Sequence, residues 1–341
     1  MLTPLVGWSL EPPPSEVEFL LRELGIEWRQ VREPDLLERL GESKKSLVLS
    51  SEPGPYLELA SKARPNSLVI VMTSDEAYDP ERLKLASASG VARVYRHYPS
   101  AQARWRPIVR AALGYVLDSR GTSQSPMTVI PNIRSGLRVR GRMGQWHAHS
   151  VFDFPLGYTD TFARVFAGHF DIPKGSSLFE APIASSSRPY AVSFRGNRGL
   201  AQRIVGFELA AAVPGTDVHT VDADWSARAG VEVGEDYVAS LLGSRFALCP
   251  PGFANNESFR FYEALACGAL PIEVSTATTH LGRMSWRSGG SISATSWRKG
   301  LAEAQAMSEE RRIHRITTAR SLVVSTLRQT ARKIRADVEN E

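Results

Sequence analysis

The sequence predicts an α/β fold in which parallel strands alternate with helices, and three observations support this prediction. Residues 244–275 read as strand, turn, helix and strand. Residues 67–72, SLVIVM, are apolar throughout, as expected for a parallel strand that is covered on both faces. The chain has 341 residues, which is long enough for two units with a core each. We therefore expect two α/β units.

The stretch 244–275 organises the rest of the chain. Residues 245–249 form an apolar run that stops at a Pro-Pro-Gly turn. Short polar side chains follow where a helix should begin, and apolar residues then recur at helical spacing from Phe259. Gly268 ends that helix, and residues 270–274 form the next strand. Such a unit places the turn and the helix N-terminus at the carboxyl edge of a parallel sheet, where open α/β sheets bind ligands.

The residue types at this edge suit a nucleotide. A helix N-terminus presents unpaired N–H groups and a partial positive charge, which favour a phosphate. Arg260 can add charge-assisted hydrogen bonds to a diphosphate, and Glu263, on the same helix face, can accept the hydroxyls of a ribose. The alternative is an ordinary strand–helix–strand unit in which Arg260 and Glu263 pair with each other.

The remaining elements follow from apolar runs, periodicity and turn residues. We expect strands at 4–8, 46–49, 67–72, 91–95, 127–130, 152–158, 190–194 and 217–221. We expect helices at 15–24, 34–40, 80–88, 106–117, 200–212, 235–242 and 308–335. A further helix should follow the SSEPGP turn and end at about residue 63. Residues 281–300 are left unassigned, and the glycine- and arginine-rich stretch 134–149 is interpreted as a loop that lines the acceptor side or lies on the surface.

Several stretches together resemble a known family. The motif SRFALCPPGF…SFRFYEALACGALPIEVS is similar to that of exostosin-like glycosyltransferases, closest to the branch of ribitol-phosphate xylosyltransferase and its bacterial relatives. Shorter pieces agree in order, and the resemblance covers roughly residues 65–280. These pieces are SDE at 74–76, GVARVYRHY at 90–98, FPLGY at 154–158 and YAVSFRGNRG at 190–199.

The resemblance implies a GT-B fold, in which two Rossmann-like domains face each other across a cleft. It also implies inverting transfer of a sugar from a nucleotide donor, usually linked to UDP, to a hydroxyl of a cell-surface glycan or polyol-phosphate acceptor. On this basis we divide the chain into an acceptor-side domain at 1–158, a linker at 159–189, a donor domain at 190–305 and a C-terminal helix at 306–341.

The donor-binding set joins the 250–263 stretch to a second strand–helix turn. At that turn two arginines flank a glycine, which lets the backbone approach a phosphate while the arginines supply charge. The alternative is a tight turn with solvated arginines. The full set is Arg195, Gly196, Asn197, Arg198, Pro250, Gly252, Asn256, Glu257, Ser258, Arg260 and Glu263. Many GT-B enzymes carry an acid eight residues before the ribose-binding one, where this chain has Asn255.

The candidate catalytic bases follow the 67–72 strand. An inverting transfer needs a general base for the acceptor hydroxyl, and Asp75 or Glu76 at the end of this strand could supply it, with Asp75 preferred. Alternatively, Asp75 caps the 80–88 helix or Glu76 is simply solvated. His147 is the second choice of base. The basic cluster Arg93, Arg96 and His97 either approaches an anionic acceptor or forms a solvated rim.

Composition limits the function further. The net charge is +5, which fits a protein that handles anionic ligands, and no basic tail or zinc spacing indicates nucleic acid. The two cysteines read as buried thiols in a reducing compartment, and with no signal-peptide pattern or membrane-length apolar run we expect a cytoplasmic protein. Arginines replace a metal, and the nucleotide sugar is the only co-substrate expected.

Three alternatives remain open. A nucleotide-sugar-binding module without transfer is the second hypothesis for the function. A Rossmann-like NAD enzyme is disfavoured because no G-x-G-x-x-G follows an early strand. The basic helix at 308–335 either crosses back onto the first domain or makes peripheral contact with a membrane that carries a lipid-linked acceptor.

Overall fold

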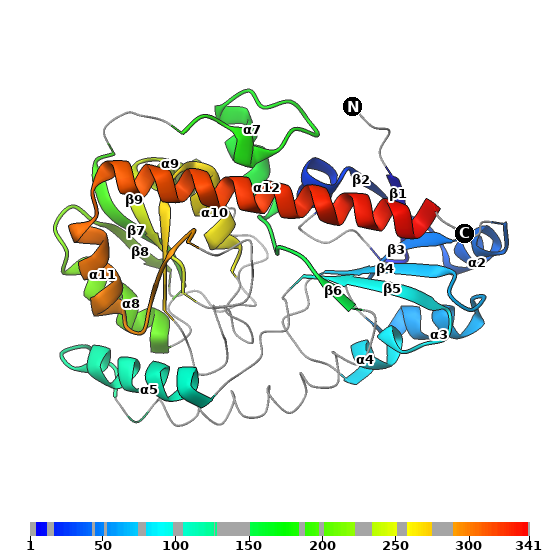
Figure 1. Cartoon of the computed structure of the whole chain (residues 1–341), viewed down its shortest axis with the longest axis horizontal. Helices are drawn as coiled ribbons and strands as arrows, with labels where there is room; N and C mark the ends of the chain where they lie inside the picture. The colour runs from blue at the N-terminus through cyan, green and yellow to red at the C-terminus, as the bar shows by residue number, and fades with distance from the viewer. Residues whose placement is uncertain are drawn as a thin grey trace.

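The structure, a computed structural model, contains two parallel sheets that lie side by side (Figure 1). It describes residues 5–11, 17–42, 45–50, 53–73, 80–97, 105–125, 127, 151–183, 188–197, 201–221, 234–250, 258–274 and 289–339.

The first sheet has six strands in the order β2-β1-β3-β4-β5-β6, all parallel. Every residue of β3 and β4 is buried, as their apolar runs predict for strands covered on both faces. The strands are β1 (Leu5–Ser9), β2 (Ile26–Gln30), β3 (Ser46–Ser50), β4 (Leu68–Met72), β5 (Val91–Arg96) and β6 (Val151–Asp153).

The second sheet has five strands in the order β11-β10-β9-β7-β8, again all parallel. They are β7 (Tyr190–Asn197), β8 (Asp217–Val221), β9 (Ser244–Leu248), β10 (Leu270–Val274) and β11 (Ile292–Ala294). The predicted α/β fold class with two Rossmann-like units is thereby confirmed. The loops that follow most strand ends, where a cleft would lie, are outside the described residues.

Helices connect the strands and cover the sheets. In the first part of the chain they are α1 (Val17–Phe19), a π-helical turn η1 (Leu20–Leu24), α2 (Glu33–Glu42), α3 (Gly54–Lys62), α4 (Pro80–Ala86) and α5 (Trp105–Ser119). After β6 come α7 (Asp160–His169), a 3₁₀ turn η3 (Leu178–Glu180), α8 (Ala201–Ala211), α9 (Glu235–Leu242), α10 (Phe259–Cys267), α11 (Trp297–Ala306) and α12 (Glu309–Glu339).

Two helices contact the unit that is farther away in sequence. Helix α12 begins beside the second sheet and runs along the molecule to the first, where Tyr95 of β5 donates a hydrogen bond of 2.6 Å to Asp337 (Figure 1). Helix α5 belongs to the range 1–158, yet Asp118 near its end accepts hydrogen bonds from the backbone N–H groups of Trp297 and Arg298 at the start of α11. Each unit thus contributes a helix to the other.

The main apolar core is continuous through both units. Its buried residues include Val69 and Val71 of the first sheet, Phe246 and Leu270 of the second, and Val323 of α12. A smaller core covers the opposite face of the first sheet. The described part of the chain contains no helix long and apolar enough to cross a bilayer.

Five elements are not predicted from the sequence. Strand β2 alternates buried and exposed residues at the edge of its sheet, so it lacks the apolar run of a central strand. Strand β11 has three residues, and helix α11 follows it in a stretch that shows little periodicity. The range 159–189 was expected to be linker, and it contains α7 and η3.

Candidate functional site

The second sheet places its topological switch point between β7 and β9. The chain leaves β7 toward β8 on one side and returns to β9 on the other, and ligands bind at the carboxyl ends of strands at such a point. The two stretches predicted to bind the donor, at the end of β7 and between β9 and α10, both belong to this edge.

Arg260 joins these two stretches. It lies in the first turn of α10, and its Nη2 donates a hydrogen bond of 2.9 Å to the backbone carbonyl of Arg195 in β7. Its guanidinium lies over the ring of Phe194, with 4.8 Å between Cζ and the ring centroid. A Cβ atom at Gly196 would lie 2.6 Å from Nη2 of Arg260. The glycine therefore makes room for the guanidinium.

The side chain of Arg195 is held by Asp217 of β8. Its Nε lies 3.2 Å from Oδ2 of Asp217, and Ser240 donates a hydrogen bond to the same carboxylate. The Arg195 guanidinium is partly exposed, whereas Asp217 is buried. Arg195 therefore contributes its carbonyl to Arg260, whereas its side chain pairs with Asp217 at the amino end of β8, away from the carboxyl edge.

Glu263, one turn further along α10, is buried with an exposed fraction of 4%. Its Oε2 accepts a hydrogen bond of 2.6 Å from the Tyr237 hydroxyl, and its Oε1 accepts from both the hydroxyl and the backbone N–H of Thr159, at 3.1 and 3.3 Å. Arg260 and Glu263, both described, form no ion pair with each other, so the alternative in which they pair is wrong.

Burial raises the pKa of Glu263. The hydrogen bonds from Tyr237 and Thr159 and the nearby charge of Arg260 oppose that rise, since they favour the ionised carboxylate. The protonation of Glu263 is therefore sensitive to the groups around it. A carboxylate held in this way has a fixed direction for its remaining lone pairs.

The C-terminal end of α10 is held by three arginines from other segments. Arg320 of α12 donates to the carbonyls of Leu265 and Ala266, Arg188 donates to Cys267, and Arg312 of α12 donates to Gly268. Positive charge at a helix C-terminus complements the helix dipole. Gly268 ends the helix with a φ of 74°, a left-handed conformation that favours glycine. This end anchors the helix whose other end forms the candidate site.

The other predicted site residues are described in part. Pro250 is buried two residues after the end of β9, and Ser258 occupies the N-cap position of α10 without a side-chain capping hydrogen bond. Asn197 ends β7, and its side chain is outside the described residues. The same holds for the whole residue at Asp75, Glu76, His147, Arg198, Gly252, Asn256 and Glu257.

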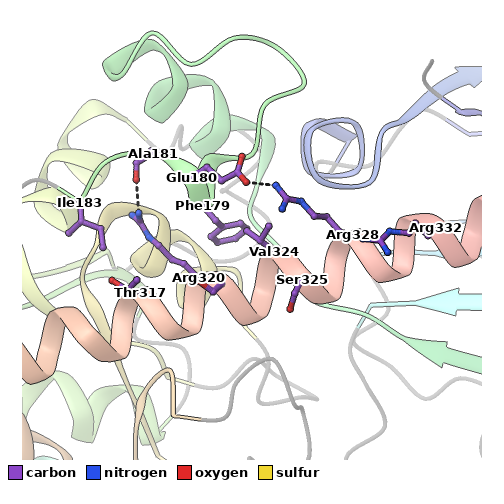
Figure 2. Close-up of a pocket in the computed structure, with 11 residues that line it drawn as sticks. Phe179, Glu180, Ala181, Ile183, Thr317, Arg320, Val324, Ser325, Arg328 and Arg332 are labelled. Atoms are coloured by element: carbon purple, nitrogen blue, oxygen red, sulfur yellow. Dashed lines mark hydrogen bonds and ion pairs between the residues drawn. The ribbon is translucent and has the colours of Figure 1, made fainter. Parts of the chain in front are cut away.

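A groove of about 560 Å³ lies elsewhere, between α12 and the segment around η3 (Figure 2). Phe179 and Val324 supply apolar surface, and Arg328 pairs with Glu180 at its rim (Figure 2). None of the described donor-binding candidates lines this groove. It is therefore separate from the edge that holds Arg260 and Glu263.

Comparison with known families decides the relationship of this chain. Residues 180–288 match the family model of the RXYLT1 C-terminal domain. Over these residues the chain is related to the RXYLT1 branch of glycosyltransferases. The RXYLT1-like segment includes β7, β9, α10 and every predicted donor-binding residue, so the resemblance read from the motif is confirmed there.

Two further comparisons complete the picture. None of the curated proteins searched matches the chain. Among solved structures, one similar fold is titled "Crystal Structure of alpha1,3-Fucosyltransferase", at 9% identity and a TM-score of 0.44, covering 99% of this chain and 91% of that chain. Similarity at this level leaves the fold to be judged from the chain's own strand order.

Two residues of the site were missed from the sequence. The sequence places Tyr237 only on the 235–242 helix and Thr159 only in the linker at 159–189. Thr159 is 104 positions from Glu263, and no local pattern connects the two. The Thr-Asp pair at the start of α7 is a recognisable helix N-cap, yet it does not indicate which carboxylate the threonine contacts.

Proposed function

We propose that this chain is a glycosyltransferase that moves a sugar from a nucleoside-diphosphate donor, UDP-linked by family resemblance, to a hydroxyl of a glycan or polyol-phosphate acceptor. The observation that carries the proposal is the contact between Arg260 and Arg195. It brings the two predicted donor-binding stretches together at the switch point of the second sheet, within the RXYLT1-like segment.

The chemistry follows from the charges at this edge. Arg260 and the N-terminus of α10 present positive charge where a diphosphate would depart, and preorganised charge of this kind stabilises the leaving group. One N–H of Arg260 donates to the Arg195 carbonyl, and its other N–H groups suit phosphate oxygens. We assign Glu263 to the ribose hydroxyls, and we propose that the reaction needs no metal because arginines carry this charge.

The transfer step is proposed as a single inverting displacement. The acceptor O–H bond breaks as the new glycosidic C–O bond forms, the bond between the sugar carbon and the phosphate oxygen breaks, and the nucleoside diphosphate leaves. Asp75 or Glu76 takes the acceptor proton in this proposal. In the sequence both acids come after β4, and they lie outside the described residues.

A thermal-shift screen with UDP-, GDP-, CMP- and dTDP-sugars tests the donor site. A ligand that binds only the folded state at 100 times its Kd stabilises the fold by about 2.7 kcal/mol, so the correct nucleotide raises Tm. Arg260→Ala and Glu263→Gln should each lose this increase. Arg311→Ala, which changes an exposed arginine of α12, should keep it.

The outcomes separate the alternatives. If no nucleotide sugar raises the Tm of the wild-type chain, or if Arg260→Ala responds as the wild type does, the proposed donor site is wrong. If a nucleotide sugar binds and no acceptor in a glycan and alditol-phosphate panel releases its nucleotide, the chain is a binding module instead of a transferase.

A further inference from the structure

The carboxylate of Glu263 accepts hydrogen bonds from two different segments. Tyr237 of α9 donates to Oε2 at 2.6 Å, and Thr159 donates to Oε1 through its hydroxyl and its backbone N–H at 3.1 and 3.3 Å. Tyr237 belongs to the same unit as Glu263, whereas Thr159 lies in the segment that joins the two units. One buried carboxylate therefore holds groups from two parts of the molecule.

The neighbours of Thr159 contact the first unit. Tyr158 donates a hydrogen bond of 2.6 Å to Glu23 in η1, and Asp160 accepts one of 2.7 Å from the backbone N–H of Glu18. Tyr158 is fully buried, and Glu23 is nearly so. Consecutive residues thus bind the first unit, the second unit and the first unit again, with Glu263 as the attachment point in the second.

On the basis of the proposed nucleotide site, we propose that Tyr237 and Thr159 are positioning residues. They orient the Glu263 carboxylate toward the vicinal hydroxyls of the ribose, and Thr159 links occupancy of that site to the segment between the two units. A carboxylate has about four lone-pair sites, so the three bonds from Tyr237 and Thr159 leave about one site, on Oε2, for a ribose hydroxyl.

Other groups around Glu263 act on the same charge. Arg260 and Cys267 lie on α10 with it, Tyr237 faces it from α9, and Cys249 follows β9 near Tyr237. Removing the Tyr237 hydroxyl removes a hydrogen bond that favours the ionised carboxylate, so the pKa of Glu263 rises further. Ribose hydroxyls donate to the ionised form. As the pH is lowered, nucleotide binding by the variant should therefore begin to weaken at a higher pH than binding by the wild type.

Calorimetric titration with UDP as the probe, from about pH 5 to about pH 8, tests this role. Tyr237→Phe should weaken UDP binding by about tenfold, because the carboxylate loses a hydrogen bond that orients it and favours its ionised form. As the pH is lowered, the affinity of this variant for UDP should also begin to fall at a higher pH than that of the wild type. Thr159→Val should weaken binding similarly, whereas Thr159→Ser, which keeps the hydroxyl and the helix cap, should restore it.

Tyr158→Phe is the matched control. It also removes a buried tyrosine hydroxyl, but this hydroxyl lies next to Thr159 in the chain and donates to Glu23 instead of Glu263. This variant should lower Tm and keep the wild-type UDP affinity and pH profile. A merely structural role for Tyr237 predicts the same pattern for Tyr237→Phe.

Three results would overturn the inference. Tyr237→Phe could bind UDP with the affinity and pH profile of the wild type, or Tyr158→Phe could lose as much affinity as Tyr237→Phe does. Either result, with normal binding by the wild type, refutes the positioning role alone. A wild-type chain that binds none of the nucleotides in the Tm screen refutes the proposed function and this inference with it.

Discussion

His97 shows how far burial changes a single residue. It follows β5, is fully buried, and packs edge-on against Phe154 with 4.3 Å between ring centroids. Within the part of the chain that is described, neither imidazole nitrogen has a hydrogen-bond partner. Arg96 beside it is also buried and lies 3.6 Å from Asp153. The expectation of a solvated rim is therefore wrong for Arg96 and His97, because both side chains at the end of β5 are buried.

Burial lowers the pKa of His97 to about 3, since the charged imidazolium loses its hydration. In the unfolded chain the imidazole titrates near 6.5. A group whose folded pKa is depressed contributes stability above the unfolded pKa and loses it as the pH falls toward the folded one. The window for this contribution therefore runs from pH 6.5 down to about pH 3.

We expect His97→Phe to remove this part of the pH dependence. Between about pH 6 and about pH 4, the wild type should lose about 1.4 kcal/mol more of its unfolding free energy per pH unit than the variant. Urea unfolding at a series of pH values measures this difference. His314→Gln, at an exposed position of α12, should keep the wild-type slope. Parallel slopes for His97→Phe and the wild type would contradict a neutral, buried imidazole.

At the scale of elements, α10 is the best-anchored helix of the candidate site. Its N-terminal turn carries Arg260, and its C-terminal carbonyls accept hydrogen bonds from arginines of α12 and of the segment before β7. The sequence predicts a basic helix at 308–335 that crosses back onto the first domain or contacts a membrane. In the structure, Arg312 and Arg320 are buried and donate to backbone carbonyls, so part of that charge is used inside the protein.

Arg320→Met should destabilise the fold strongly. The substitution roughly keeps the volume and removes the guanidinium that donates to the carbonyls of Leu265, Ala266 and Ala181, for which we expect a loss of about 3 kcal/mol. Urea unfolding at neutral pH measures it. Arg328→Met, two turns along the same helix, breaks an exposed ion pair with Glu180 and should cost less than about 1 kcal/mol. Equal losses in both variants would show that the carbonyl contacts contribute little.

At the scale of the whole molecule, the two sheets are joined by more than the chain between them. Helix α12 reaches the first sheet through Tyr95 and Asp337, α5 caps α11 of the second unit, and the Glu23 and Glu263 carboxylates hold consecutive residues of the joining segment. The main core runs through both units. Separate unfolding of either unit would expose part of that shared core.

We therefore expect both sheets to unfold in one cooperative transition. In native-state hydrogen exchange, the slowest amides of β4 and of β10 should open with the same free energy, because the opening that exposes either strand is global. Mass spectrometry of peptides from the two sheets measures this. A free energy of opening lower by several kcal/mol in β4 than in β10 would show instead that the first unit opens by itself.

The sequence by itself determined the central strands, most of the helices and the RXYLT1-like motif. Apolar runs and helical periodicity are local properties, so β4, β9, α10 and β10 could be placed from neighbouring residues alone. The same local pattern placed Arg260 and Glu263 on one helix near a sheet edge. Short elements such as β2 and β11 were missed because an exposed edge strand carries no apolar run.

Only the tertiary structure decided which distant groups meet. The contact of Arg260 with Arg195 and those of Glu263 with Thr159 and Tyr237 depend on how strands are ordered in the sheet. The exchange of α5 and α12 between the units depends on which apolar faces cover each other. Such contacts join residues far apart in the chain, and their energies arise from burial and hydrogen bonding that no local stretch of sequence contains.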